Sequence, residues 1–144
     1  MGTQFVVTSG AVATSTSAKT ILALIAGATS SPALIGFDFS SDGTVTTGQY
    51  LVEVIKFTTG GTSAGATPFK IGGTSSVVST AATYSAEPTT PTVVAALYVP
   101  AMQAYSYLYP LGREISLALS TMLALRVTAP SGTPNVRVNL YFEE

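Results

Sequence analysis

Two segments near the end of the chain alternate apolar and polar residues with a period of two. In residues 122–129 and 136–142 the apolar members are Leu123, Leu125, Val127, Val136, Val138, Leu140 and Phe142. Successive side chains of a strand point to opposite faces, so this pattern predicts two strands with one buried face each. The connector 130–134 holds two prolines and a glycine, which end both strands. We therefore expect a terminal β-hairpin.

Similar short segments, rich in Val, Ile, Thr, Tyr and Phe, recur between Gly and Pro residues along the whole chain. They predict ten strands, at residues 3–8, 20–26, 33–40, 49–58, 69–71, 92–99, 104–109, 115–119, 122–129 and 136–142. No long segment has the period of a helix. Residues 58–65 and 72–86 are rich in Gly, Ser and Thr and predict long loops. The sequence thus predicts one all-β domain over residues 1–144, an antiparallel β-sandwich with jelly-roll topology.

Two of these segments are apolar at every position rather than at alternate ones. They comprise residues 21–26 and 93–99. Such segments are typical of central strands covered on both sides, and equally of strands that place one face in a subunit contact. Both interpretations stay open at the level of sequence.

The chain has few charged residues. They make up 9% of the sequence, against about 25% in an ordinary soluble domain, and runs of Ser and Thr take their place. The net charge is -1 and the six basic residues are dispersed, so no basic patch for nucleic acid is expected. The longest apolar run, residues 21–28, is shorter than the roughly 18 residues of a membrane span. A surface of this kind favours association with other proteins.

The residue types needed for most catalytic chemistry are missing. The sequence contains no histidine and no cysteine, which argues against common general-base, zinc and thiol mechanisms. The seven carboxylates are scattered, and the glycine-rich segment 60–65 lacks the Gly-Lys-Ser/Thr ending of a phosphate-binding loop. We therefore expect no enzymatic activity, no cofactor and no metal site.

Two groups of residues are candidates for contacts with other molecules. Tyr105, Tyr107 and Tyr109 fall on one face of a predicted strand, where they suit a subunit interface, a sugar-stacking platform or an ordinary core edge. The segment 1–17 is small and polar apart from a patch around Phe5 and Val7. It predicts either an N-terminal arm that docks on a neighbouring subunit through Phe5 and Val7, or an ordinary first strand.

The chain resembles the small jelly-roll capsid decoration, or cement, proteins of tailed bacteriophages. The resemblance rests on its short cysteine-free sequence, its richness in Ala, Gly, Ser, Thr and Val, a start without an expected targeting signal, and its ending: a strand, the turn Pro-Ser-Gly-Thr-Pro, a strand and Phe142-Glu143-Glu144. It implies a homotrimer on the outer capsid surface of the virion that clamps neighbouring subunits of the major capsid protein. No functional residue is carried over individually. The alternative is a carbohydrate- or receptor-binding jelly-roll module, such as a fibre tip or a lectin-like domain.

Overall fold

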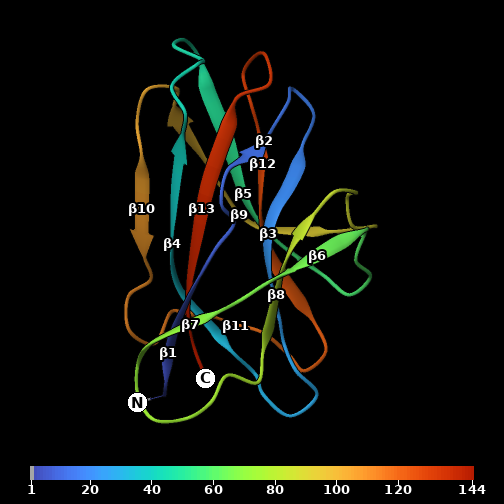
Figure 1. The fold of residues 1–144 in the computed structure, drawn as a ribbon, viewed down its shortest axis with the longest axis vertical. Helices are drawn as coiled ribbons and strands as arrows, with labels where there is room; N and C mark the ends of the chain where they lie inside the picture. Colours follow the sequence, from blue (N-terminus) through green and yellow to red (C-terminus); the bar gives the residue numbers. More distant parts are fainter. Residues whose placement is uncertain (1) are drawn as a thin grey trace.

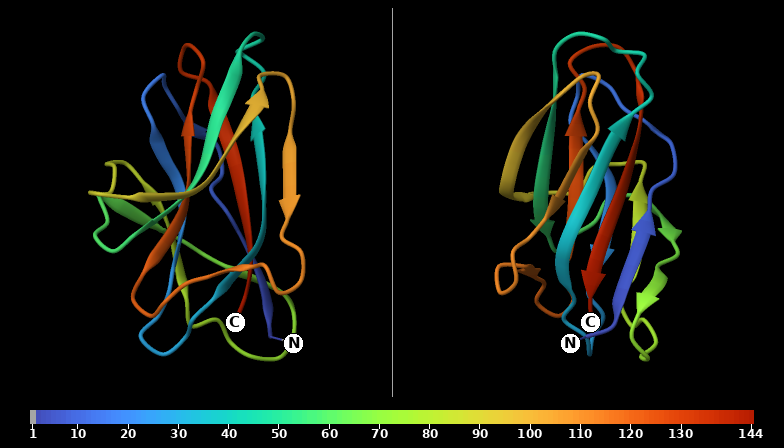
Figure 2. Two further views of the ribbon diagram at one scale, coloured as in Figure 1. Left: turned by 180° about the vertical axis from the view of Figure 1, so that it is seen from behind. Right: turned by 90° about the vertical axis from the view of Figure 1, so that its left-hand side faces the viewer.

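The computed structural model describes residues 2–144, which form two antiparallel sheets packed face to face (Figures 1 and 2). Sheet A contains, in spatial order, β10 (Tyr105–Leu108), β4 (Ala33–Ser41), β13 (Asn135–Glu143), β1 (Gln4–Thr8) and β7 (Phe69–Gly72); β2 (Val12–Ala13) pairs with β13 and β11 (Ile115–Ser116) with β4. Sheet B contains β6 (Ser63–Ala66), β8 (Thr80–Tyr84), β3 (Lys19–Ile25), β12 (Met122–Thr128), β5 (Gln49–Phe57) and β9 (Thr92–Pro100). The predicted all-β sandwich is thus confirmed.

The main core fills the space between the two sheets. Its largest side chains include the pair Phe5 and Phe142, stacked with ring centroids 5.3 Å apart, and the pair Phe39 and Tyr50 at 5.2 Å. A smaller apolar cluster lies on the other face of sheet B, where Phe57 and Tyr84 meet edge to face at 5.8 Å. Sheet B therefore has buried apolar side chains on both faces around β3, β12 and β5, which explains why β3 is apolar at every position from Ile21 to Ile25.

The two apolar segments of the sequence have different positions. β3 is a central strand, and its residues Ile21 to Leu24 are fully buried. β9 is an edge strand, in which Val93, Val94 and Tyr98 are exposed. Of the two interpretations of such segments, a covered central strand holds for β3, and β9 keeps an open apolar surface.

The predicted terminal hairpin is wrong. β12 pairs with β3 and β5 in sheet B, whereas β13 pairs with β1 and β4 in sheet A. Each strand places one face in the main core. β12 covers this core from the side of sheet B and β13 covers it from the side of sheet A. The alternating pattern reports only which face is buried, so it is the same for a hairpin and for two strands that face each other across a sandwich.

Part of the predicted loops is regular structure. Residues 58–65 overlap β6, and residues 72–86 contain the whole of β8. β8 pairs with β3 along Leu22 to Ile25, and its Ala81 and Ala82 are buried. Alanine has a low strand propensity, so this strand is stabilised by burial against its neighbours rather than by its own sequence.

The predicted N-terminal arm is a core strand instead. β1 pairs with β13 on one side and with β7 on the other. Phe5 is 2% exposed and Val7 1% exposed, because both point between the sheets. Met1 lies outside the described residues. Phe5 and Val7, predicted as interface residues, therefore belong to the core of their own chain, and the alternative of an ordinary first strand describes this segment.

Candidate interaction surface

Exposed apolar side chains gather in one continuous part of the chain, from β9 to the turn after β10. Of the eleven large hydrophobic residues exposed within residues 2–144, seven fall between positions 93 and 111: Val93, Val94, Tyr98, Met102, Tyr107, Leu108 and Leu111. We call this set the β9–β10 surface. Tyr98, Leu108 and Leu111 are 67%, 70% and 97% exposed. Apolar side chains clustered in this way mark an interaction surface more often than isolated ones do.

The topology explains why these residues lie on one side of the molecule. β9 is an edge of sheet B and β10 is an edge of sheet A, and only residues 101–104 separate them in sequence. In the right-hand view of Figure 2, β9 and β10 lie at one side of the sandwich and β6 and β7 at the other. The connection between the sheets thus brings both free edges to the same side of the sandwich, with Leu108 on the outer face of sheet A and Val94 and Tyr98 on the outer face of sheet B.

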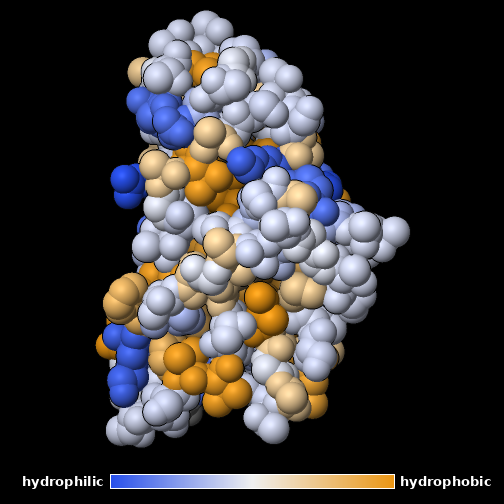
Figure 3. All heavy atoms as spheres, turned by 45° about the vertical axis from the view of Figure 1, so that its right-hand side comes forward, coloured by the Kyte–Doolittle hydropathy of each residue, from blue (hydrophilic) through white to orange (hydrophobic). Residues whose placement is uncertain are grey.

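The face turned forward in Figure 3 is polar but largely uncharged. Figure 3 shows a face dominated by residues of intermediate hydropathy, with scattered apolar patches and few strongly hydrophilic groups. Such hydroxyl-rich surfaces are weakly hydrated compared with charged ones, and short side chains lose little entropy when they are covered. The surface chemistry predicted from the composition is therefore present on the folded chain.

Tyr105, Tyr107 and Tyr109 lie on one face, as predicted from their spacing. Tyr105 is opposite Phe39 and Tyr107 opposite Phe37 in the pairing of β10 with β4, so the tyrosines point to the core side of sheet A. The rings of Tyr105 and Tyr107 stack 6.4 Å apart, and Tyr107 meets Tyr109 edge to face at 4.9 Å. The three rings close the open side of the sandwich beyond Phe37.

Within this stripe only Tyr107 is substantially open to solvent. It is 38% exposed, whereas Tyr105 and Tyr109 are half-buried against the core. Burial raises the pKa of Tyr109 to about 12, with a further contribution from Tyr107 and Tyr105. Tyr107 is the member of the stripe that a partner reaches first.

The acidic group nearest to the tyrosines faces the other way. Asp38 accepts hydrogen bonds from the hydroxyls of Ser106 (2.5 Å) and Tyr141 (2.7 Å) and from the side-chain amide of Asn139 (3.3 Å). Partial burial raises the pKa of Asp38, but these hydrogen bonds outweigh it and hold the pKa below its usual value. Ser106 lies between Tyr105 and Tyr107, so its side chain points to the opposite face of β10. The aromatic rings and the Asp–Asn group do not form one sugar-binding platform.

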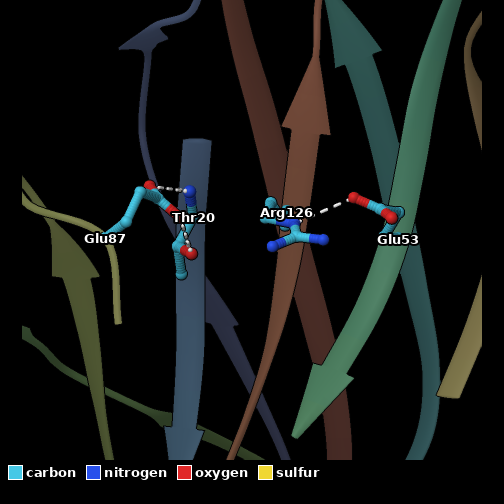
Figure 4. A network of polar contacts seen from close by, with 4 residues as sticks. All are labelled: Thr20, Glu53, Glu87 and Arg126. Carbon is cyan, nitrogen blue, oxygen red and sulfur yellow. Dashed lines mark hydrogen bonds and ion pairs between the residues drawn. The ribbon is translucent and has the colours of Figure 1, made fainter. Parts of the chain in front are cut away.

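A second polar group lies on the outer face of sheet B (Figure 4). The guanidinium Nε of Arg126 donates to the Glu53 carboxylate at 2.8 Å, and both side chains are mostly buried. Glu87 accepts from the backbone N–H of Thr20 at 2.5 Å and from its hydroxyl at 2.7 Å. Glu87 follows β8 in the sequence. Its carboxylate therefore accepts a hydrogen bond from the backbone N–H of Thr20 in β3 where β8 no longer pairs with that strand. Both contacts hold together neighbouring parts of sheet B.

Residues 2–144 contain no group of three or more Asp, Glu, His or Cys side chains placed to hold a metal ion. The described residues also contain no helix that is long and apolar enough to span a membrane. A hollow lies beside Leu108 and Leu111 on the outer face of sheet A. Its lining combines the apolar Ile35 and Tyr109 with the polar Gln4, Glu114 and Glu143.

Comparisons with known proteins give no match. The chain matches no protein-family model, and neither a curated protein nor a solved structure matches it.

Proposed function

We propose that this chain is a structural virion protein: a decoration, or cement, protein that binds the outer surface of an icosahedral phage capsid and stabilises it. The observation that carries the proposal is the β9–β10 surface, where seven large apolar side chains lie exposed on a chain with 9% charged residues. The resemblance in composition to phage cement proteins gives the class of partner, the major capsid protein. No catalytic role, cofactor or metal is part of the proposal.

The surface chemistry suits a permanent contact. Apolar and hydroxyl-bearing side chains desolvate at low cost, whereas a charged surface has to be paired before it is buried. A protein that binds only the assembled shell stabilises it by mass action, because every bound copy favours the assembled state. The chain needs no chemistry beyond such contacts to perform this function.

The proposed oligomer is a homotrimer held together next to β10. Tyr107, Leu108 and Leu111 supply the exposed apolar area, and the hollow beside Leu108 accepts side chains of a neighbouring copy. Tyr105 and Tyr109 hold Tyr107 in place through ring contacts. Three-fold closure would hide these groups, which a soluble monomer would otherwise leave in water.

Jelly-roll topology is the finer part of the fold proposal. The chain changes sheet between β3 and β4, between β4 and β5, between β9 and β10, and between β12 and β13. Such alternation places consecutive strands in opposite sheets, as in a jelly-roll, rather than in neighbouring hairpins.

Binding to capsids tests the function directly. Purified chain is mixed with capsids of the phage that encodes it, after the shells have been stripped of the chain, and co-sedimentation is measured together with the temperature at which the shells open. Saturable binding and a higher opening temperature are expected. A Leu111→Ser variant should bind less because it weakens the proposed three-fold contact, and an Ile71→Ser variant, exposed on the opposite edge, should bind normally. Absence of saturable binding by the unmodified chain contradicts the proposal.

A further inference from the structure

β9 is by far the longest of the four edge strands. β6, β7 and β10 have four residues each, whereas β9 has nine. Within residues 2–144, the only strand that pairs with β9 is β5. The outward backbone N–H and C=O groups of an edge strand are a template for a further strand, so a long open edge has to be protected or paired.

The usual protections are absent from β9. β7 carries Lys70 on its edge, but β9 has no charged residue, and its proline, Pro100, stands at its last position. One bulge interrupts it, where Val93 pairs with Ile55 and Ala95 with Val54. From Val94 onwards the strand alternates regularly. The features with which proteins prevent edge-to-edge association are thus missing over most of its length.

The alternation gives the free edge two different sides. Val94, Ala96 and Tyr98 are exposed on the outer side, whereas Ala95 and Leu97 are half-buried and Val99 is buried on the core side. A partner that adds to this edge must therefore be an extended, uncharged strand with apolar residues on both sides. β9 itself has this sequence.

We propose that β9 pairs with β9 of a second copy of the chain, antiparallel about a two-fold axis at Ala96, so that two B sheets become one continuous sheet. In this register the two Ala96 residues oppose each other. Val94 of each copy faces Tyr98 of the other on the outer side, and Ala95 faces Leu97 on the core side. The two copies thereby cover each other's open edge.

This register is favoured over its neighbours by the residues it brings together. Pairs of an aromatic and a β-branched side chain stabilise antiparallel strands, and no like charges meet. A shift of the axis to Leu97 would place Pro100, which has no N–H, opposite Val94 within the paired region. Moving one strand by a single residue would place outer side chains opposite inner ones.

The contact uses only the β9 part of the β9–β10 surface, and it is distinct from the three-fold contact next to β10. It joins two copies of the chain, or two trimers where the three-fold contact also forms. Failure of capsid binding would leave it intact, and its own failure would leave the capsid proposal intact.

Single cysteines test the pairing cleanly because the natural chain has none. Opposed residues of antiparallel strands have Cα atoms about 4.5–5.5 Å apart, within the range that a disulfide spans. Ala96→Cys should therefore form a cross-linked dimer under mild oxidation, seen on a non-reducing gel. Val94→Cys and Tyr98→Cys should each stay uncross-linked alone and should cross-link when mixed. Circular dichroism checks that each variant is folded.

The pattern of cross-linking among the three cysteine variants distinguishes the proposed register from chance contact. Absence of the Ala96→Cys dimer, or equal cross-linking by all three single variants, would overturn the proposal, since the first excludes the register and the second indicates random collision. In the cysteine-free chain, Val94→Lys should raise the dissociation constant of the pair by about tenfold or more, measured by analytical ultracentrifugation. Ile71→Lys, an equally apolar and exposed position on β7, should leave it unchanged. Equal effects of the two lysines would also count against β9.

Discussion

The carboxylate of Glu144 accepts a hydrogen bond from the backbone N–H of Ser79 at 2.6 Å, so the last residue of the chain holds the loop before β8. The same carboxylate accepts from the N–H of Val78 at 2.8 Å and from the hydroxyl of Ser30 at 3.0 Å. Three segments distant in the sequence thus meet at one side chain. This contact joins the end of β13 in sheet A to the loop that precedes β8 in sheet B.

The contact predicts a pH-dependent stability. Burial raises the pKa of Glu144, but the hydrogen bonds from Ser79, Val78 and Ser30 outweigh it and lower the pKa. Because the pKa is lower in the folded state, the ionised carboxylate stabilises the fold. This stabilisation is fully present above the usual glutamate pKa of about 4.3 and is lost as the pH falls through the lowered value. Glu144→Gln should therefore lower the free energy of unfolding by about 1 kcal/mol at pH 7.

Urea unfolding at several pH values checks this. The difference between the natural chain and Glu144→Gln should shrink as the pH falls below 4, because both side chains are then neutral. Glu114→Gln is the control, since it removes a carboxylate that is not part of the contact with Ser79, Val78 and Ser30. A difference that stays constant down to low pH would contradict the assigned role of the charge.

The ion pair of Glu53 and Arg126 predicts an asymmetric response to substitution. Both side chains are mostly buried, 12% and 18% exposed, so removal of one partner leaves a desolvated charge alone. Arg126→Met should lower the free energy of unfolding by about 1–3 kcal/mol. Adding Glu53→Gln to it should restore part of that loss, which a double-mutant cycle measures. Arg137→Met, at an exposed position on β13, is the control; losses that simply add would exclude coupling.

The sequence predicted strands better than it predicted their partners. The period of two around Leu125 and Val138 correctly identified one buried face on β12 and β13, but the choice of neighbouring strand depends on the connector and on the opposite sheet. β8 escaped detection because alanines carry its buried face, and alanine gives no periodic signal. Segments apolar at every position looked alike, although β3 is central and β9 is an edge, because hydropathy records what is apolar and not what covers it.

The candidate surface was predicted in part for the same reason. The spacing of Tyr105, Tyr107 and Tyr109 fixed their common face, but not whether it pointed to the core or to water. Pairing with Phe37 and Phe39 decides that. Leu108 and Leu111 had no distinguishing pattern in the sequence, and only the position of β10 at an edge reveals their exposure.

Gly36 predicts a strict limit on side-chain size between β4 and β10. A Cβ at this position would lie 2.6 Å from the Leu108 side chain and 2.7 Å from the backbone oxygen of Tyr107. Because backbone cannot yield as a side chain does, Gly36→Ala should displace β10 and lower the free energy of unfolding by about 1–3 kcal/mol. Gly65→Ala, where no atom lies within 4 Å of the added Cβ, should have little effect. Equal melting temperatures for the two variants would contradict this packing.

The burial of Phe5 predicts that the first strand is needed for folding. Phe5→Ala removes a ring stacked on Phe142 and should lower the free energy of unfolding by about 3–5 kcal/mol. Val6→Ala, on the adjacent outward-facing position, should cost far less. Deletion of residues 1–10 should unfold the chain, as seen by circular dichroism. If the deletion variant stays folded but binds capsids less well, the result would support the N-terminal docking arm instead.

The tyrosine stripe predicts a separation between stability of the chain and stability of its oligomer. Tyr109 is half-buried against the core, so Tyr109→Ala should lower the free energy of unfolding by about 2–4 kcal/mol. Tyr107 is the exposed member, so Tyr107→Ala should cost about 1 kcal/mol of unfolding free energy and act mainly on association, where truncation of an anchoring aromatic costs about 2 kcal/mol or more. Light scattering after size exclusion, with denaturation in parallel, measures both quantities. Phe69→Ala is the matched control, since it removes an exposed aromatic ring from β7, away from both β9 and β10. If Tyr107→Ala leaves the trimer as stable as in the natural chain, the contact lies elsewhere. If the natural chain is monomeric at high micromolar concentration, the proposal of a trimer is contradicted.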